Sequence, residues 1–217
     1  MTTTLTVPAP QLRQALQTAS AFMCDDDTFS TLNGVHLAPD GDPAGDRVAF
    51  TATNLFVASH ETLKISGEAF EATIPGRVVT ALIAVLAPID VEDDNDPHFG
   101  PVPPVEPFDL ATFALADDGK QMTVRLVGVN TIEIGFESPS MKFPNIPLIF
   151  DQAETAAQQL AGLHFDPGQL GAVLDAVRGR DDGEPLKVVG AANGKPMLVR
   201  RGEAFKALVM SVKVPND

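Results

Sequence analysis

Apolar and polar positions along the chain change their period in an order that recurs. Residues 4–7 alternate as in a short strand, and three further alternating segments, bounded by turn-rich stretches, lie at residues 32–37, 47–53 and 56–65. Between the first strand and the other three, apolar residues follow helical spacing at Leu12, Ala15, Leu16, Ala19 and Phe22. The pattern therefore predicts a strand, a helix that starts near Pro8, and three more strands.

The same order occurs twice more. The second copy has a strand at 70–74, a helix from Pro75 and strands at 108–116, 122–127 and 131–137. The third has a strand at 163–165, a helix from Pro167 and strands at 186–189, 196–200 and 205–212. The predicted buried positions of the two helices are Val78, Ala81, Leu82, Val85 and Leu86, then Leu170, Val173, Leu174 and Val177. A repeat of about 55 to 70 residues predicts an α+β fold built from three β-α-β-β-β units.

Two segments interrupt the repeat. Residues 88–107 contain six prolines and six acidic residues, a composition that favours an exposed loop. Residues 144–160 run from a proline-broken apolar piece into a polar stretch, which is typical of a connector. We therefore predict one complete two-unit domain at 1–150, and a connector with a third unit at 151–217.

Charge is unevenly distributed along the chain. The formal net charge is -14, which disfavours a simple basic nucleic-acid binder. Residues 1–164 hold 7 basic and 22 acidic side chains, giving -15, whereas residues 165–217 hold 8 and 7, giving +1. A protein that keeps its few cations on one surface could still contact DNA loosely.

Composition also limits location and chemistry. A single cysteine, Cys24, excludes an internal disulfide and fits a reducing cytoplasm, and no apolar run is long enough to span a bilayer. The four histidines are scattered, and the acidic runs at 25–27 and 92–96 lack the alternation of a calcium loop. There is no phosphate-binding loop motif, and we expect no catalytic residues, no metal and no cofactor.

Four stretches resemble one family. They are TLNGVHLAPDG followed by RVAFTATNL, EATIPGRVV, KQMTVRLVGVNTIEIGFESPSMKFPN, and KPMLVRRGEAFKALVMSVKV. In this order they resemble the bacterial DNA polymerase III beta sliding clamp family. The resemblance implies the sliding-clamp fold, with helices lining a ring and sheets outside. It also implies a non-enzymatic processivity factor that encircles double-stranded DNA and binds DNA polymerase and the clamp loader through short linear peptides.

Departures from the family pattern are also evident. Asn54 stands where the family usually has Asp, Phe56 where it often has His or another polar residue, and Ser211 where it has Pro. The family has six half-domains per chain, and this sequence has three predicted units. If the ring keeps twelve, four chains would form a homotetramer whose unpaired third units meet across a two-fold axis. A trimer or a dimer stays open, and the short length suggests a phage source in an infected bacterial cell.

The resemblance also implies two sets of site residues. Polar residues expected to face DNA are Arg13, Gln14, Gln17, Arg77, Arg178, Arg180, Arg200 and Arg201. The partner-peptide pocket would contain Thr53, Leu55, Phe56, Pro144, Ile149, Pro196, Leu208 and Met210. The alternatives are that the first set is ordinary solvated surface and that the second is core. An alternative function is a clamp-derived interaction module that binds replication peptides without encircling DNA, and another is a small acidic enzyme.

Overall fold

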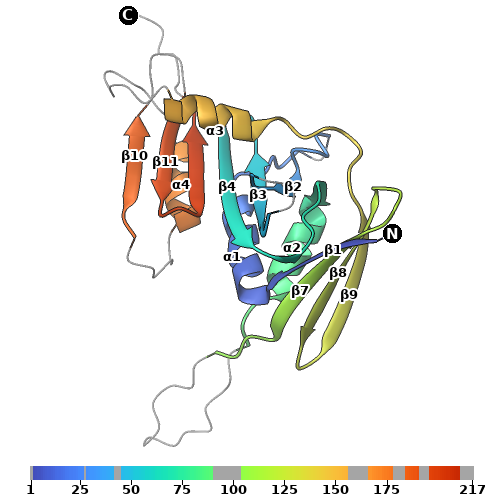
Figure 1. Cartoon of the computed structure of the whole chain (residues 1–217). Coiled ribbons are helices and arrows are strands. Elements are labelled where there is room, and N and C mark those ends of the chain that lie inside the picture. The colour runs from blue at the N-terminus through green and yellow to red at the C-terminus, as the bar shows by residue number, and fades with distance from the viewer. Residues whose placement is uncertain are drawn as a thin grey trace, which may run out of the picture.

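The computed structural model describes residues 2–26, 28–41, 45–89, 104–155, 166–177, 184–190 and 196–210. Its helices are α1 (Ala9–Ser20), α2 (Gly76–Val85), α3 (Ile146–Thr155) and α4 (Pro167–Val177). Its strands are β1 (Thr3–Pro8), β2 (Gly34–Pro39), β3 (Arg47–Thr53), β4 (Val57–Lys64), β5 (Ser66–Gly67), β6 (Ala72–Pro75), β7 (Phe108–Leu115), β8 (Gln121–Gly128), β9 (Thr131–Glu137), β10 (Leu186–Gly190), β11 (Met197–Arg201) and β12 (Phe205–Val209). The described residues form an α+β fold with two antiparallel sheets, as predicted (Figure 1).

Three helix-plus-strands units follow one another along the chain. They are α1 with β2–β4, α2 with β7–β9, and α4 with β10–β12. Proline precedes the first two helices, and its fixed φ near -60° at Pro8 and Pro75 suits the turn from strand into helix. The strand predicted at 163–165 lies outside the described residues.

The first two units are interlocked by exchange of their leading strands. β1 pairs with β7 of the second unit over six residues, from Thr3 to Pro8, and β6 pairs with β2 of the first unit. The two sheets therefore have the orders β5-β1-β7-β8-β9 and β10-β11-β12-β4-β3-β2-β6. Because each unit completes the other's sheet, the pair forms one body.

The third unit extends the sheet of the first unit. β12 pairs with β4 from Phe205 opposite Glu61 to Val209 opposite Val57. α4 packs on the same face as α1, since Val173 and Val177 belong to the same buried cluster as the α1 residues. One edge of the third unit is thus paired within the chain, and β10 remains the end strand of the sheet.

The predicted buried positions of two helices need correction. On α2, Ala81 is exposed and Val79 is buried, and on α4, Leu174 is exposed although Val173 and Val177 are buried. Both helices are apolar on more than one face, so periodicity alone could not choose between neighbouring positions. Packing against α1 and the sheet determined which of the neighbouring positions is buried.

The connector forms a helix that the sequence reading missed. α3 begins just before Pro147, and proline is tolerated in the first turn of a helix because the N–H groups there have no helical partner. Ile146, Phe150 and Ala153 then recur at helical spacing and are buried. The predicted domain boundary near 150 falls within this helix.

The loop predicted at 88–107 is closed at its base. Ile89 and Val105 form an isolated antiparallel bridge, with N–H to carbonyl distances of 2.9 and 3.0 Å. Residues 90–103 lie outside the described residues. No helix of the described chain is long and apolar enough to cross a membrane.

Candidate functional site

α1, α2 and α4 share one face of the two sheets. Residues from all three helices belong to one buried cluster, and α1 contacts both of the others. Figure 1 shows α1 and α2 side by side against the strands, with α4 behind β11. In sequence the three helices contain two arginines and one aspartate, giving +1, in a chain whose net charge is -14. This layer is therefore almost uncharged in a strongly acidic protein.

The exposed side of α1 and α2 holds four of the predicted DNA-facing residues. Gln14, Gln17 and Arg77 are exposed. Arg13 is half-buried, and its Nη2 lies 3.1 Å from Oε1 of Glu106, just before β7. Three of these side chains are therefore available to a ligand on the helix face, and the fourth is already engaged by a carboxylate.

The predicted arginines of the third unit lie elsewhere. Arg200 shares the outer face of the sheet with Leu198, which packs under α3, so Arg200 points away from the helices. Its place in the DNA-facing set is corrected for this reason. Arg201 is on the helix side, where its Nη1 donates to the carbonyl of Val177 at 2.7 Å and ties the end of α4 to the sheet. Two predicted residues lie outside the described part of the chain, Arg178 and Arg180.

The turn between β3 and β4 presents two apolar side chains to solvent. Asn54 Oδ1 accepts the N–H groups of Phe56 at 3.1 Å and Val57 at 3.0 Å, and Thr53 Oγ1 donates to the Val57 carbonyl at 2.8 Å. Leu55 has a positive φ of 75°, which is unfavourable for a branched side chain. Leu55 and Phe56 are each 61% exposed, and the hydrogen-bonded turn holds them there.

The other predicted pocket residues divide into exposed and buried groups. Met210 and Ile149 are exposed, and Pro144 and Pro196 are half-buried. Thr53 and Leu208 are buried. Pro144 also lines a small hollow of about 190 Å³ beside Phe29, which contains none of the other predicted residues. Phe56 and Met210 lie at the seam where the first and third units pair. Together with Leu55 and Ile149 they are the exposed apolar members of the predicted pocket, and we call these four the seam residues.

α3 and the preceding segment cover the outer face of the seven-stranded sheet at this seam. Phe143 stacks on the ring of His36 with centroids 4.5 Å apart, and Phe150 contacts the ring of His60 at 5.6 Å. The small buried cluster beneath them contains Ala58, Phe143, Ile146, Phe150, Ala153, Leu198 and Leu208. This layer buries Leu208 and joins strands of two units.

Both histidines of this layer have carboxylate neighbours. Asp40 Oδ1 lies 3.6 Å from His60 Nε2, and its other oxygen accepts the Thr62 hydroxyl at 2.8 Å. Hydrogen bonding to His60, helped by Thr62, lowers the pKa of Asp40 to about 2. His36 lies 3.6 Å from Glu71, but burial outweighs this carboxylate and lowers the pKa of His36. Both groups serve the packing of the outer layer.

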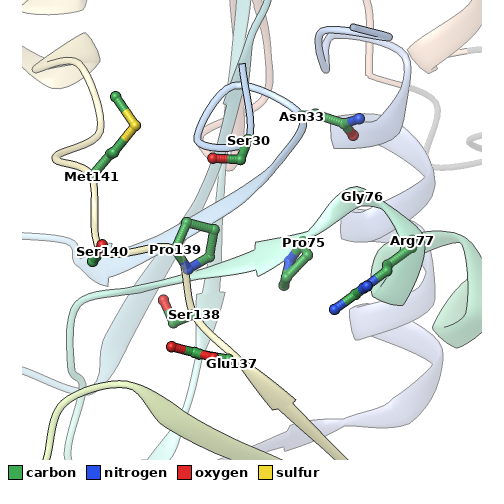
Figure 2. Close-up of a pocket in the computed structure, with 10 residues that line it drawn as sticks. All are labelled: Ser30, Asn33, Pro75, Gly76, Arg77, Glu137, Ser138, Pro139, Ser140 and Met141. Carbon is green, nitrogen blue, oxygen red and sulfur yellow. The ribbon is translucent and has the colours of Figure 1, made fainter. Parts of the chain in front are cut away.

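A hollow is formed where the first and second units meet residues 138–141, which follow β9 (Figure 2). Its volume is about 660 Å³, and its lining includes Arg77 and Glu137 but no histidine or cysteine. At its edge, a Cβ on Gly76 would lie 2.0 Å from Asn33 Oδ1, so a larger residue there would displace the Asn33 side chain. Three serines line it, Ser30, Ser138 and Ser140, and Ser138 accepts the Thr73 N–H at 2.9 Å through Oγ. The charged side chains that the hollow presents are therefore one arginine and one glutamate.

Metal-ligating side chains are not grouped in the described residues. No cluster of three or more His, Cys, Asp or Glu side chains with metal-binding geometry occurs there. The acidic run 92–96 lies outside the described residues, so the expectation about it stays a prediction.

Comparison with solved structures shows the same arrangement of units. The DNA polymerase sliding clamp from Bacillus subtilis superposes with a TM-score of 0.68 at 15% identity, covering 98% of this chain and 64% of that chain. The chain has the sliding-clamp fold. The DNA polymerase III beta subunit from Thermotoga maritima (TM-score 0.66, 14% identity, 100% and 66% covered) and the sliding clamp from Pseudomonas aeruginosa (0.65, 12%, 98% and 67%) have the same fold. This chain thus spans about two thirds of the length of these clamps, and no protein-family model or curated protein matches its sequence.

Sequence reasoning missed three features of this fold. The Arg13–Glu106 pair joins residues 93 positions apart and leaves no local signal. The stacking of Phe143 on His36 likewise depends on tertiary structure. The helical spacing of Ile146, Phe150 and Ala153 was present in the sequence and could have predicted α3 despite the prolines.

Proposed function

We propose that the protein is a non-catalytic sliding clamp that assembles with copies of itself into a ring around double-stranded DNA and tethers replication proteins to it. The observation that carries the proposal is the nearly uncharged helix layer on one side of a sliding-clamp fold that extends over almost the whole chain. The Bacillus subtilis protein with this fold is a DNA polymerase sliding clamp.

The helix layer suits loose contact with DNA. Affinity for DNA comes mainly from neutralised phosphates, and each neutralised phosphate makes binding more salt-dependent. Arg77, Gln14 and Gln17 offer one cation and two amides on the exposed helix surface, and Arg13 is engaged with Glu106. So few contacts would give weak binding without sequence preference, and enclosure would supply the retention.

The seam residues suit a short peptide with apolar anchors. Leu55 and Phe56 are held outward by a hydrogen-bonded turn, and Met210 follows the strand that pairs beside them. A rigid turn lowers the ordering cost of binding, and a methionine can adapt to different anchor side chains. We propose that polymerase and loader peptides dock on Leu55, Phe56, Met210 and Ile149, and that Leu208 supports the site from beneath.

Two measurements test the ring. Light scattering after size-exclusion chromatography gives the number of copies, with four expected from twelve units per ring. Electron microscopy should then show a closed particle with a central hole. A particle that remains a single copy at high concentration would exclude encirclement and leave the interaction module that binds peptides without a ring.

Retention on DNA tests the topological mechanism. The protein is cross-linked into a closed ring on nicked circular DNA, and the complex is then cut once with a restriction enzyme. A ring that holds DNA by enclosure should stay on the circle in high salt and leave the linear product. Equal loss from both forms would contradict enclosure.

Peptide binding is tested with polymerase-derived peptides and a matched pair of variants. Phe56→Ala should weaken binding at least about tenfold, because aromatic anchors carry much of the energy of such interfaces. Phe29→Ala is the control, since Phe29 is also an exposed phenylalanine but lies in a different turn. Equal effects of the two substitutions would contradict the assignment of the seam residues.

A further inference from the structure

A row of polar side chains crosses the outer face of the seven-stranded sheet. Each strand places one residue in the row, and neighbouring members are paired in register. From β10 to β6 the row contains Lys187, Arg200, Lys206, His60, Thr51, His36 and Thr73. The part on the third unit is therefore a run of three cations on neighbouring strands, and we call Lys187, Arg200 and Lys206 the cation row.

The two halves of this row differ in what covers them. Phe143 stacks on His36 and Phe150 contacts His60, so the connector covers the histidines. In the cation row, Lys187 is exposed, and Arg200 and Lys206 are half-buried. The cationic half therefore reaches solvent beside the connector.

The cation row concentrates positive charge in an acidic protein. The chain has 15 basic and 29 acidic residues, and like charges opposite each other on neighbouring strands destabilise a sheet. The pKa of Asp40 is lowered mainly by its hydrogen bond with His60 and to a smaller extent by Lys206, so one carboxylate lies near the end of the row. That carboxylate is already engaged by His60 and Thr62. Such a concentration of charge is what an anionic ligand would recognise.

The position of the cation row favours a peptide over duplex DNA. The helix layer lies on the opposite face of the sheets, so DNA held against it does not reach the outer face. Lys206 and Met210 instead follow the same alternation on β12, four residues or about 13 Å apart. Leu208 lies between them and is covered by α3. The cation row and the seam residues therefore lie on the two sides of α3.

We propose that the cation row binds an acidic stretch of the same partner peptides whose apolar anchors dock on the seam residues. This inference rests on the proposed function and adds a second contact for those peptides. A spacer must cross α3, whose diameter with side chains is about 10 Å, and about eight extended residues span up to roughly 28 Å. Exposed ion pairs are individually weak, so three of them should raise affinity about tenfold at low salt and lose this effect near 1 M salt.

Extended peptides test the second contact. A polymerase-derived peptide is extended by an eight-residue Gly/Ser spacer and three glutamates, at the N-terminus in one version and at the C-terminus in another. The same extensions ending in three serines are the matched peptides. Fluorescence anisotropy at low and high salt measures binding, and the glutamates should raise affinity about tenfold in one of the two directions at low salt only.

Matched variants place the gain on the protein. Lys187→Gln and Arg200→Gln should each remove much of the gain and leave binding of the unextended peptide unchanged. Lys120→Gln and Arg125→Gln remove the same charges from exposed positions outside the seven-stranded sheet and should leave the gain intact. Thermal unfolding checks that each variant is folded.

The outcomes separate the cation row from the seam site. No gain from the glutamates in either direction, or an equal loss of gain in the control variants, overturns the cation row while the seam site still stands. Binding of the extended peptide that is unaffected by Phe56→Ala but lost in Lys187→Gln overturns the seam site and supports the cation row. Failure of every peptide to bind overturns both.

A DNA ligand is the remaining outcome. A single-stranded oligothymidylate is titrated against the protein and against Lys187→Gln. Binding that this substitution weakens, together with no gain from the glutamates, would make the cation row a nucleic-acid contact and overturn the acidic peptide.

Discussion

The backbone amide of Met210 donates a hydrogen bond of 3.0 Å to the carbonyl of Phe56. This bond continues the ladder between β12 and β4 by one step beyond the Val209–Val57 pair. It therefore joins the end of the third unit to the turn that opens β4 of the first unit. The two exposed apolar side chains at this place come from units about 150 residues apart, and only the pairing of β12 with β4 makes them neighbours.

Leu55→Gly is expected to stabilise the protein by about 1 kcal/mol, because glycine accepts the positive φ that costs a branched side chain roughly that much. Urea unfolding followed by circular dichroism measures the change in the free energy of unfolding. Phe56→Gly is the matched control in the same turn. Phe56 has no positive φ, so its replacement should give no gain, and a similar gain in both variants would contradict the backbone explanation.

Phe150→Ala is expected to lower the free energy of unfolding by about 3 kcal/mol, since Phe150 is buried in the cluster that joins α3 to two units. Leu148→Ala on the same helix removes an exposed side chain and should change stability by less than about 0.5 kcal/mol. Denaturant unfolding compares the two variants. Alanine is the best helix former, so a loss cannot come from helical propensity, and equal losses in the two variants would contradict the contribution of the outer cluster.

Glu106→Gln is expected to strengthen DNA binding at low salt, because it removes the carboxylate partner of Arg13 and frees that guanidinium for a phosphate. The slope of log affinity against log salt should steepen by about one unit for each added phosphate contact. Fluorescence anisotropy over a salt series measures both quantities. Asp109→Asn removes an equal charge from an exposed site nearby, and the same steepening in that variant would point to net charge alone.

Stability is expected to fall as the pH drops below about 6.5, the usual pKa of histidine. Burial lowers the pKa of His36, partly opposed by Glu71, so the unfolded chain binds the proton more readily than the folded one. The contribution of His36 to the free energy of unfolding is fully present above its pKa in the unfolded chain. It declines as the pH falls towards its lower pKa in the folded chain. Unfolding curves between pH 8 and 5 measure the slope.

His36→Gln should flatten that slope, because the replacement cannot take up a proton. Glu71→Gln should steepen it, since removing the carboxylate 3.6 Å away leaves burial unopposed. The ring of Phe143 and the hydroxyl of Thr73 also contact His36, and neither titrates in this range. An unchanged slope in both variants would assign the pH dependence to other groups.

Sequence patterning was sufficient for the three units and for most strand positions. The predicted bounds of β9 and β3 match the observed ones. Alternation of apolar and polar residues indicates a strand, because successive side chains point to opposite faces of the sheet. The resemblance carried by the short motifs agrees with the sliding-clamp fold of the structure. The buried positions of helices with apolar residues on several faces were predicted less well. Ala81 and Leu174, for example, are exposed although they were expected to be buried.

Tertiary structure alone decided which edges pair and which residues those pairings bring together. The backbone groups of a strand are the same whatever the side chains, so alternation cannot say that β12 joins β4 and leaves β10 at the end. That choice turned Arg200 to the outer face, buried Leu208 beneath α3 and placed Met210 beside Phe56. It also left β9 and β10 as end strands of the two sheets, because register and edge position depend on contacts between segments far apart in the chain.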